Sequence, residues 1–142
     1  MREGQAAILE EESADSVLRP SSFVRIENLT KGTIVANKAK RADGFFARGR
    51  GLMLAPPLSE GGGLIIEPCN SIHMFFMRYP LDVLFIDNDR RVLFLYEGIK
   101  PWRVGRLVKG ARMAIELPAG TINRTQTEVG DKLSLERPKQ IT

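Results

Sequence analysis

Residues 81–87 have the sequence LDVLFID, in which every position except the two aspartates is large and apolar. Such a run leaves neither face of a strand polar, so it predicts a strand that is covered on both sides. The turn-forming pair Asn88-Asp89 follows, and residues 91–98 then resume a strand-like pattern. This stretch therefore predicts a β-hairpin whose first strand is covered on both faces.

Short segments rich in β-branched and aromatic residues recur on both sides of this hairpin, separated by Gly, Pro, Asn and Asp. The three consecutive glycines at 61–63 predict a turn, and residues 120–127 predict a short helix. The expected strands are residues 23–28, 33–37, 64–67, 71–77, 81–87, 91–98, 112–117 and 132–136.

The hydrophobic period changes over residues 39–53. Ala42, Phe45, Leu52 and Met53 fall on one helical stripe there, which predicts an amphipathic helix packed on the sheet. The resulting fold class is α+β and mostly β: a small bent or barrel-like antiparallel sheet with one main amphipathic helix.

The composition fits one globular domain. The chain has 142 residues, with 21 Lys and Arg against 17 Asp and Glu and a net charge of +4. Its 43% hydrophobic and 27% charged residues are near globular averages, which excludes a fully disordered or collagen-like chain. We expect a mobile acidic tail at 1–20, a globular domain at 21–138 and a short tail at 139–142.

The single cysteine, Cys69, excludes an internal disulfide. The first residues show no secretory signal, and no apolar run is long enough to span a membrane. We therefore expect a soluble, cytoplasmic protein with no membrane contact, while the oligomeric state stays open.

Residues 68–82, with the sequence PCNSIHMFFMRYPLD, contain the only histidine and the only cysteine. Together with Gly51-Leu52-Met53 before them, and Glu116-Leu117-Pro118-Ala119-Gly120 and Gly130-Asp131 after them, they form an ordered set of motifs. In this order and spacing the set resembles the prokaryotic domain-of-unknown-function family number 192, over roughly residues 23–136. That resemblance implies no reaction, because the function of the family is itself unassigned.

His73 and Asp82 are the main candidate pair. If residues 71–77 and 81–87 form a tight hairpin, His73 lies opposite Asp82 and the two side chains share a face. A carboxylate in that place would raise the pKa of the imidazole, and Arg78 and Glu116 could extend the pair into a polar network. Either these groups satisfy one another inside the sheet, or they line a pocket for a small polar or anionic ligand.

The pocket is the interpretation that we rank first among functions: a non-catalytic ligand-binding or interaction module using His73, Arg78, Asp82 and Glu116, with no cofactor. The catalytic alternative is a hydrolase or transferase with His73 as general base, assisted by Cys69 as nucleophile. His73, Asp82 and Glu116 could also form a metal site, but we predict no metal.

The third option is weak nucleic-acid binding through residues 100–112, called the basic loop below, which carries five cations, no acid and Trp102. Because the net charge of +4 is modest, we do not expect a nucleic-acid partner.

Overall fold

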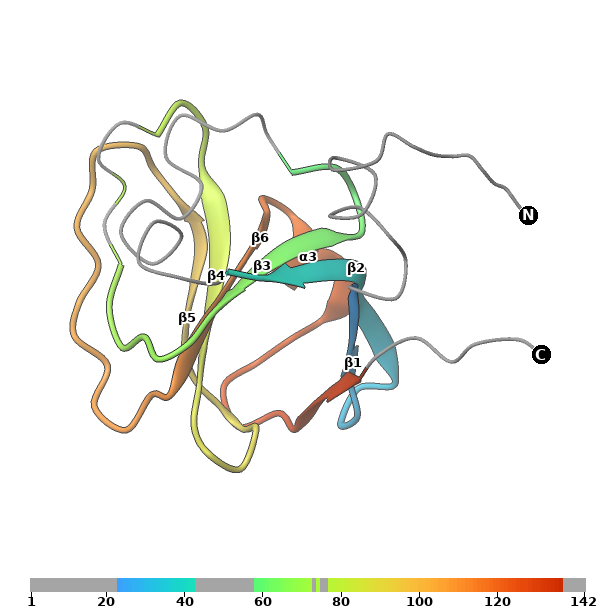
Figure 1. The fold of residues 1–142 in the computed structure, drawn as a ribbon. Coiled ribbons are helices and arrows are strands. Elements are labelled where there is room, and N and C mark those ends of the chain that lie inside the picture. Colours follow the sequence, from blue (N-terminus) through green and yellow to red (C-terminus); the bar gives the residue numbers. More distant parts are fainter. Residues whose placement is uncertain (1–22, 43–57, 73, 75–76, 137–142) are drawn as a thin grey trace, which may run out of the picture.

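The computed structural model describes residues 23–42, 58–72, 74 and 77–136. These residues form a mostly β fold with one short helix (Figure 1). No helix in this part of the chain is long and apolar enough to cross a bilayer. The elements are β1 (Val24–Asn28), β2 (Thr33–Arg41), β3 (Gly62–Ile66), β4 (Leu81–Ile86), β5 (Val92–Ile99), β6 (Met113–Pro118), α3 (Thr121–Thr125) and β7 (Leu133–Glu136).

All seven strands belong to one sheet, in the order β5-β4-β6-β3-β2-β1-β7. Five of the neighbouring pairs are antiparallel, as expected. The pair β2–β3 is parallel, with Ala39 beside Gly63, so the sheet is mixed and the expectation of an antiparallel sheet is wrong at this pair.

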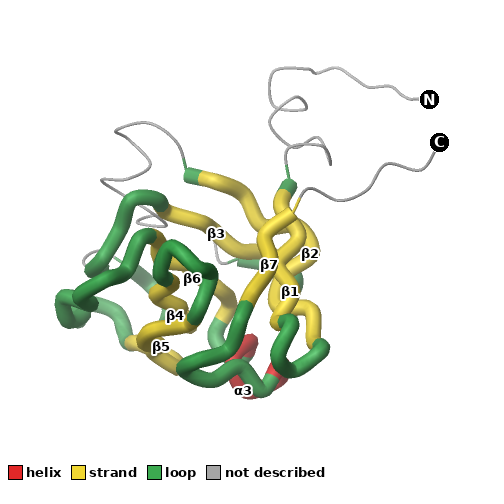
Figure 2. Tube along the Cα trace, turned by 90° about the horizontal axis from the view of Figure 1, so that it is seen from below, coloured by secondary structure: helices red, strands yellow, loops and turns green. Residues whose placement is uncertain are grey.

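The sheet bends so strongly that its two edge regions meet. Val92, at the start of β5, donates its N–H to the Asp131 carbonyl at 2.9 Å and accepts one from Gly130 at 2.8 Å. An isolated bridge joins Arg91 to Lys132 beside these bonds. Figure 2 shows the consequence: β4, β5 and β6 form one side, β1, β2 and β7 form the other, and α3 lies between them at one end.

Strand β4 is buried on both faces along its whole length, which confirms the prediction from the LDVLFI run. Its alternate residues feed two hydrophobic clusters. Leu84 and Ile86 belong to an inner cluster, to which β1, β2, β3, β6, β7 and α3 all contribute. Leu81, Val83 and Phe85 belong to an outer cluster on the opposite face, which includes Ile72 and Met74. Two separate cores therefore share one central strand.

The main helix expected at 39–53 is wrong at its beginning, because residues 39–41 continue β2. Ala39 is fully buried between Val24 of β1 and Gly63 of β3, and this pairing overrides the helical period that begins at the same position. Residues 43–53 lie outside the described part of the chain. The expected glycine turn is also shorter than predicted, because Gly62 and Gly63 already belong to β3. The short helix expected within 120–127 is confirmed as α3.

The expected strand at 71–77 is wrong for the residues of this segment that the structure describes, none of which is in a strand. Both edges of β4 are already paired, with β5 on one side and β6 on the other, so β4 has no free edge for the preceding segment. That segment bonds to the basic loop instead. Met74 N–H donates to the Arg103 carbonyl at 2.7 Å, and Gly105 N–H donates to the Ile72 carbonyl at 2.9 Å.

Candidate functional site

Asp82 is completely buried, and its carboxylate is held by backbone N–H groups from two other segments. Oδ1 accepts from Gly98 of β5 at 2.8 Å. Oδ2 accepts from Gly120 at 3.1 Å and from Ile122 at 2.8 Å, at the first turn of α3. Because the α3 N-cap residue, Gly120, supplies no side-chain acceptor, Asp82 takes over that task from the neighbouring strand. These bonds make Asp82 an anchor for α3 and for β5.

The bond from Gly98 depends on a β-bulge. Between the paired positions Leu81↔Ile99 and Val83↔Tyr96, two residues of β5 stand opposite the single residue Asp82. Gly98 has φ +72°, the left-handed conformation that glycine adopts most readily. The bulge brings its N–H onto the Asp82 carboxylate.

Glu116 is a second buried carboxyl group, and it has none of these partners. Only 5% of the residue is exposed, and its Oε1 has no hydrogen-bond partner in the described structure. It stands on β6 between Leu64 of β3 and Val83 of β4, so its flanking side chains are apolar. Burial raises the pKa of Glu116 from 4.5 to about 7. A carboxyl group with a pKa near neutral pH in an apolar setting is typical of a functional residue.

The register between β4 and β6 separates the two carboxyl groups. Asp82 pairs with Leu117, whereas Glu116 pairs with Val83. Because successive side chains alternate between faces, Asp82 lies on the face of the inner cluster and Glu116 on the face of the outer cluster. A metal ion cannot use both carboxylates. Among the described residues, no three His, Cys, Asp or Glu side chains come close enough to form a metal site.

Cys69 and Tyr79 lie on the Glu116 side and pack against the outer cluster. Burial raises the pKa of Cys69, the Glu116 charge raises it further, and a backbone hydrogen bond at Ser71 partly opposes both effects. The thiol Sγ lies 3.0 Å from the Ser71 carbonyl, to which it donates. Burial followed by the charge of Glu116 likewise raises the pKa of Tyr79. All three groups therefore favour their neutral forms.

His73 lies outside the described residues, so its place relative to Asp82 and Glu116 stays a prediction. Its sequence neighbours Ile72 and Met74 are buried in the outer cluster, on the face of Glu116 and opposite that of Asp82. Arg78 is exposed in the bend before β4. The structure thus brings Glu116 together with the segment flanking His73 and directs Asp82 away from it.

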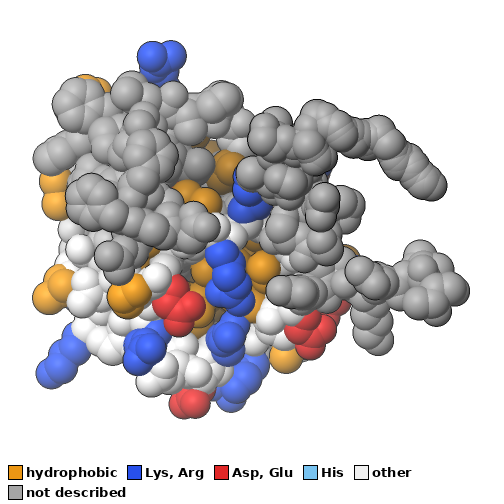
Figure 3. All heavy atoms as spheres, viewed as in Figure 1, with side chains coloured by type: hydrophobic (Ala, Val, Ile, Leu, Met, Phe, Trp, Pro, Cys, Tyr) orange, Lys and Arg blue, Asp and Glu red, His pale blue; other side chains and the backbone are white. Residues whose placement is uncertain are grey.

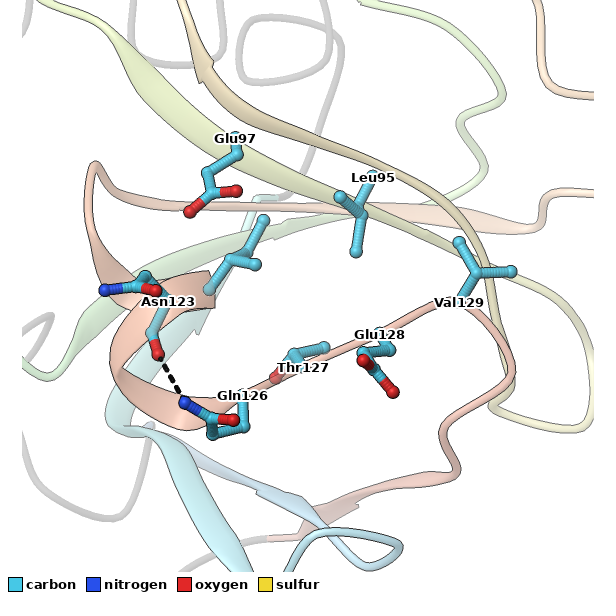
Figure 4. Close-up of a pocket in the computed structure, with 8 residues that line it drawn as sticks. Leu95, Glu97, Asn123, Gln126, Thr127, Glu128 and Val129 are labelled. Atoms are coloured by element: carbon cyan, nitrogen blue, oxygen red, sulfur yellow. Dashed lines mark hydrogen bonds between the residues drawn. The ribbon is translucent and has the colours of Figure 1, made fainter.

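A surface hollow of about 550 Å³ lies beside α3 (Figure 4), and Arg78, Asp82 and Glu116 are not among its lining residues. Two carboxylates, Glu97 and Glu128, and two amides, Asn123 and Gln126, line it together with aliphatic side chains. Its polar residues are mostly exposed, and Glu128 already pairs with Lys31 at 3.0 Å. This hollow therefore offers solvated groups rather than a desolvated one such as Glu116.

Another buried polar cluster ties the β1–β2 turn to the loop before β7. Asn28 Nδ2 donates to Asp131 Oδ2 at 2.9 Å and to Thr127 Oγ1 at 3.2 Å. Lys31 Nζ lies 2.7 Å from the same Asp131 oxygen. Burial acts to raise the pKa of Asp131, but hydrogen bonds from Asn28, Lys31 and the Glu128 N–H outweigh it, and the pKa is lowered. Its polar groups are matched to one another, as in a structural network.

With this geometry established, comparison with known proteins assigns the family. The profile of DUF192, described as "Uncharacterized ACR", matches residues 26–135. The chain belongs to the DUF192 family. A UPF0127 protein of Thermococcus sibiricus is 40% identical over 113 residues, covering 77% of this chain and 73% of the relative. A UPF0127 protein of Pyrococcus furiosus is 33% identical over 115 residues, covering 78% of this chain and 97% of the relative.

The DUF192 fold also has a crystallographic counterpart. A protein of unknown function from Novosphingobium aromaticivorans superposes with a TM-score of 0.67 at 24% sequence identity. The match covers 79% of this chain and 83% of that protein. At this identity the similarity concerns the fold alone, and the chemistry of the DUF192 domain has to be inferred from its own residues.

From the sequence, Glu116 is expected only as an extension of the His73–Asp82 pair. The signal that it is a separate buried carboxyl was available: Glu116 is the one charged residue in the strand Met113–Pro118, whose other residues are apolar. The partners of Asp82 had no such signal, because all three are backbone N–H groups, which leave no trace in the residue types.

Proposed function

We propose that this DUF192 domain is a non-catalytic module that binds a small polar molecule, and that Glu116 is its central binding group. The observation that carries the proposal is the Oε1 atom of Glu116, which is buried and has no partner among the described residues. An unsatisfied buried polar atom costs about 1–3 kcal/mol, so its retention needs a reason. A ligand that supplies the missing hydrogen bond is such a reason.

The chemistry of Glu116 defines the ligand end that it would hold. Burial raises its pKa, and among the described residues no cation compensates its charge. The group would therefore take a hydrogen-bond donor such as an amine, amide or hydroxyl, lying against the apolar side chains of Leu64 and Val83. Any anionic part of the ligand would lie at the other end, where Arg78 and His73 are the candidate contacts. Asp82 would act only indirectly, by anchoring α3.

The proposal is tested with small fragments of defined hydrogen-bonding character. We expect acetamide and ethanolamine to shift the backbone amide resonances of Leu64 and Val83, and acetate, which lacks a donor, to leave them unchanged. Affinity for these donors should rise as the pH passes through about 7, because ionised Glu116 is the better acceptor. A merely structural Glu116 would give no ligand-dependent shift.

Three variants make the test specific. Glu116→Gln removes the ionisable acceptor and should abolish the pH dependence of binding, and His73→Ala should weaken binding while leaving the fold intact. Glu97→Gln is the matched control, since Glu97 is an exposed carboxylate on β5, which β4 separates from the strand of Glu116. If the donors bind the Glu116→Gln and Glu97→Gln proteins equally well, the site is elsewhere and the proposal fails.

The catalytic alternative finds less support in the surroundings of Cys69. A nucleophilic cysteine needs a lowered thiol pKa, whereas burial and the charge of Glu116 both raise it here. A cytoplasmic location, expected from the cysteine content, stays a prediction.

A further inference from the structure

The basic loop, residues 100–112 between β5 and β6, presents exposed apolar side chains among its cations. Trp102 is 58% exposed, and Val104 and Leu107 are each 66% exposed. Lys100, Arg103, Arg106, Lys109 and Arg112 are also exposed. In Figure 3 hydrophobic side chains reach the surface along the left edge, where this segment runs in Figure 1. Large apolar groups gathered on one exposed segment indicate an interaction surface.

Buried residues and hydrogen bonds hold the loop in a defined conformation, although several of its side chains are exposed. Ile99, which precedes the loop, and Val108 within it are both buried in the outer cluster. Trp102 N–H donates to the Met74 carbonyl at 2.7 Å, and Arg106 N–H donates to the Tyr96 hydroxyl at 2.7 Å. The Arg106 guanidinium also lies 4.8 Å above the ring of Phe94.

A hollow at the base of the loop adds a place for an anionic group. It has a volume of about 380 Å³ and is lined by Lys100, Arg103, Tyr96, Ile99 and Val104. Two cations beside aliphatic and aromatic carbon match a phosphate carried on an apolar body. Free phosphate would use the cations alone and leave Trp102, Val104 and Leu107 in water.

We propose that the basic loop is a docking surface for an anionic lipid membrane, with Trp102, Val104 and Leu107 entering the interfacial region and the cations contacting lipid phosphates. Tryptophan is favoured at the membrane interface, and juxtamembrane cations are attracted to anionic leaflets. A nucleic acid would match the cations but not the two exposed aliphatic side chains. The domain would then lie on a membrane through one loop, independently of the ligand proposed at Glu116.

Trp102 provides the probe, because it is the only tryptophan of the chain. The full chain is mixed with vesicles of phosphatidylcholine containing about one third phosphatidylglycerol, and with vesicles of phosphatidylcholine alone. We expect co-sedimentation, a blue shift of the Trp102 emission and quenching by brominated lipid only with the anionic vesicles. Binding should weaken as salt is added.

Two pairs of variants separate the apolar from the ionic contribution. Val104→Ser with Leu107→Ser should lower the partition coefficient by about tenfold or more, since both side chains lose apolar burial. Lys100→Glu with Arg103→Glu should lower it by about fivefold or more for each cation removed. The matched controls are Leu29→Ser with Val129→Ser, exposed apolar residues elsewhere, and Lys38→Glu with Arg124→Glu, exposed cations elsewhere. The controls should bind like the unmodified chain.

Equal binding to neutral and anionic vesicles would overturn the proposal, as would an unshifted Trp102 emission. The same holds if the loop variants bind as well as their controls. Tighter binding of a single-stranded oligonucleotide than of the anionic vesicles at the same salt concentration would identify a nucleic-acid surface instead. Thermal unfolding of each variant shows that it is folded, and the vesicle assay does not depend on any ligand at Glu116.

Discussion

Asp82 and Glu116 stand on adjacent strands, one register position apart, and their side chains leave the sheet on opposite faces. Asp82 meets three backbone N–H groups, whereas Glu116 meets an apolar cluster and keeps an oxygen without a partner among the described residues. Two carboxyl groups in the same pair of strands thus have opposite roles. One holds backbone N–H groups of β5 and α3 in place, and the other destabilises the fold when it ionises.

The pH dependence of stability should report the ionisation of Glu116. Its pKa is about 7 in the folded chain and about 4.5 when unfolded, so the folded state binds more protons between these values. The free energy of unfolding should therefore fall as the pH rises from about 4.5 to about 7, by roughly 3 kcal/mol in total. In Glu116→Gln this fall should be absent, and above pH 7 the variant should be the more stable protein.

Urea unfolding between about pH 5 and pH 8 measures this difference. Glu97→Gln, the exposed carboxylate control, should keep the pH profile of the unmodified chain. A Glu116→Gln profile that runs parallel to that of the unmodified chain would show that Glu116 is not the titrating group.

Replacing Asp82 should lower the free energy of unfolding at neutral pH, whereas replacing Glu116 should raise it. In Asp82→Asn the charge is lost, and the amide can direct only one acceptor oxygen toward the N–H groups of Gly98, Gly120 and Ile122. We expect a loss of roughly 3 kcal/mol, because hydrogen bonds to a charged group are worth about 1.5–3 kcal/mol each. Hydrogen exchange should show the amides of Gly120 and Ile122 losing protection first. Asp89→Asn, in the exposed β4–β5 turn, is the control and should change stability little.

The difference between these two carboxylates marks the limit of what the sequence could predict. The run LDVLFI predicts a strand buried on both faces, because large apolar residues occupy both faces of the strand. Which face receives Asp82 follows from local periodicity, but what lies on that face depends on β6 and α3, about 30 to 40 residues further along the chain. The expected hairpin between 71–77 and β4 could not take these distant strands into account, and β4 pairs with β5 and β6 instead.

A similar competition explains Ala39. The stripe that begins there is amphipathic at helical spacing, yet Ala39 is small enough to fit between β1 and β3, where Gly63 allows a close approach. Non-local pairing thus decides a segment whose local pattern suits a helix. Local signals sufficed for β1, β4, β5 and α3, where turn residues and apolar alternation agree.

The reactivity of Cys69 measures how burial and Glu116 affect its thiol, and this measurement does not depend on stability. Because burial and the Glu116 charge raise its thiol pKa, alkylation by iodoacetamide at neutral pH should be about tenfold or more slower than in the urea-unfolded chain. In Glu116→Gln the midpoint of the rate against pH should move to a lower value. Cys69 is the only cysteine, so the label needs no site assignment. Alkylation as fast as in urea would restore the nucleophile hypothesis.

Acid unfolding should depend on Asp131. Hydrogen bonds from Asn28, Lys31 and the Glu128 N–H outweigh burial and lower the pKa of Asp131 below its ordinary value of 3.8. The folded state therefore binds fewer protons than the unfolded chain near this value, so the contribution is complete above about pH 4 and is lost as the pH falls through the folded pKa. Asp131→Asn should be less stable than the unmodified chain at neutral pH, and the two unfolding curves should converge in acid. Glu128→Gln, which changes only the exposed partner of Lys31, should keep the acid transition, because Asn28 and Lys31 still hold the Asp131 carboxylate.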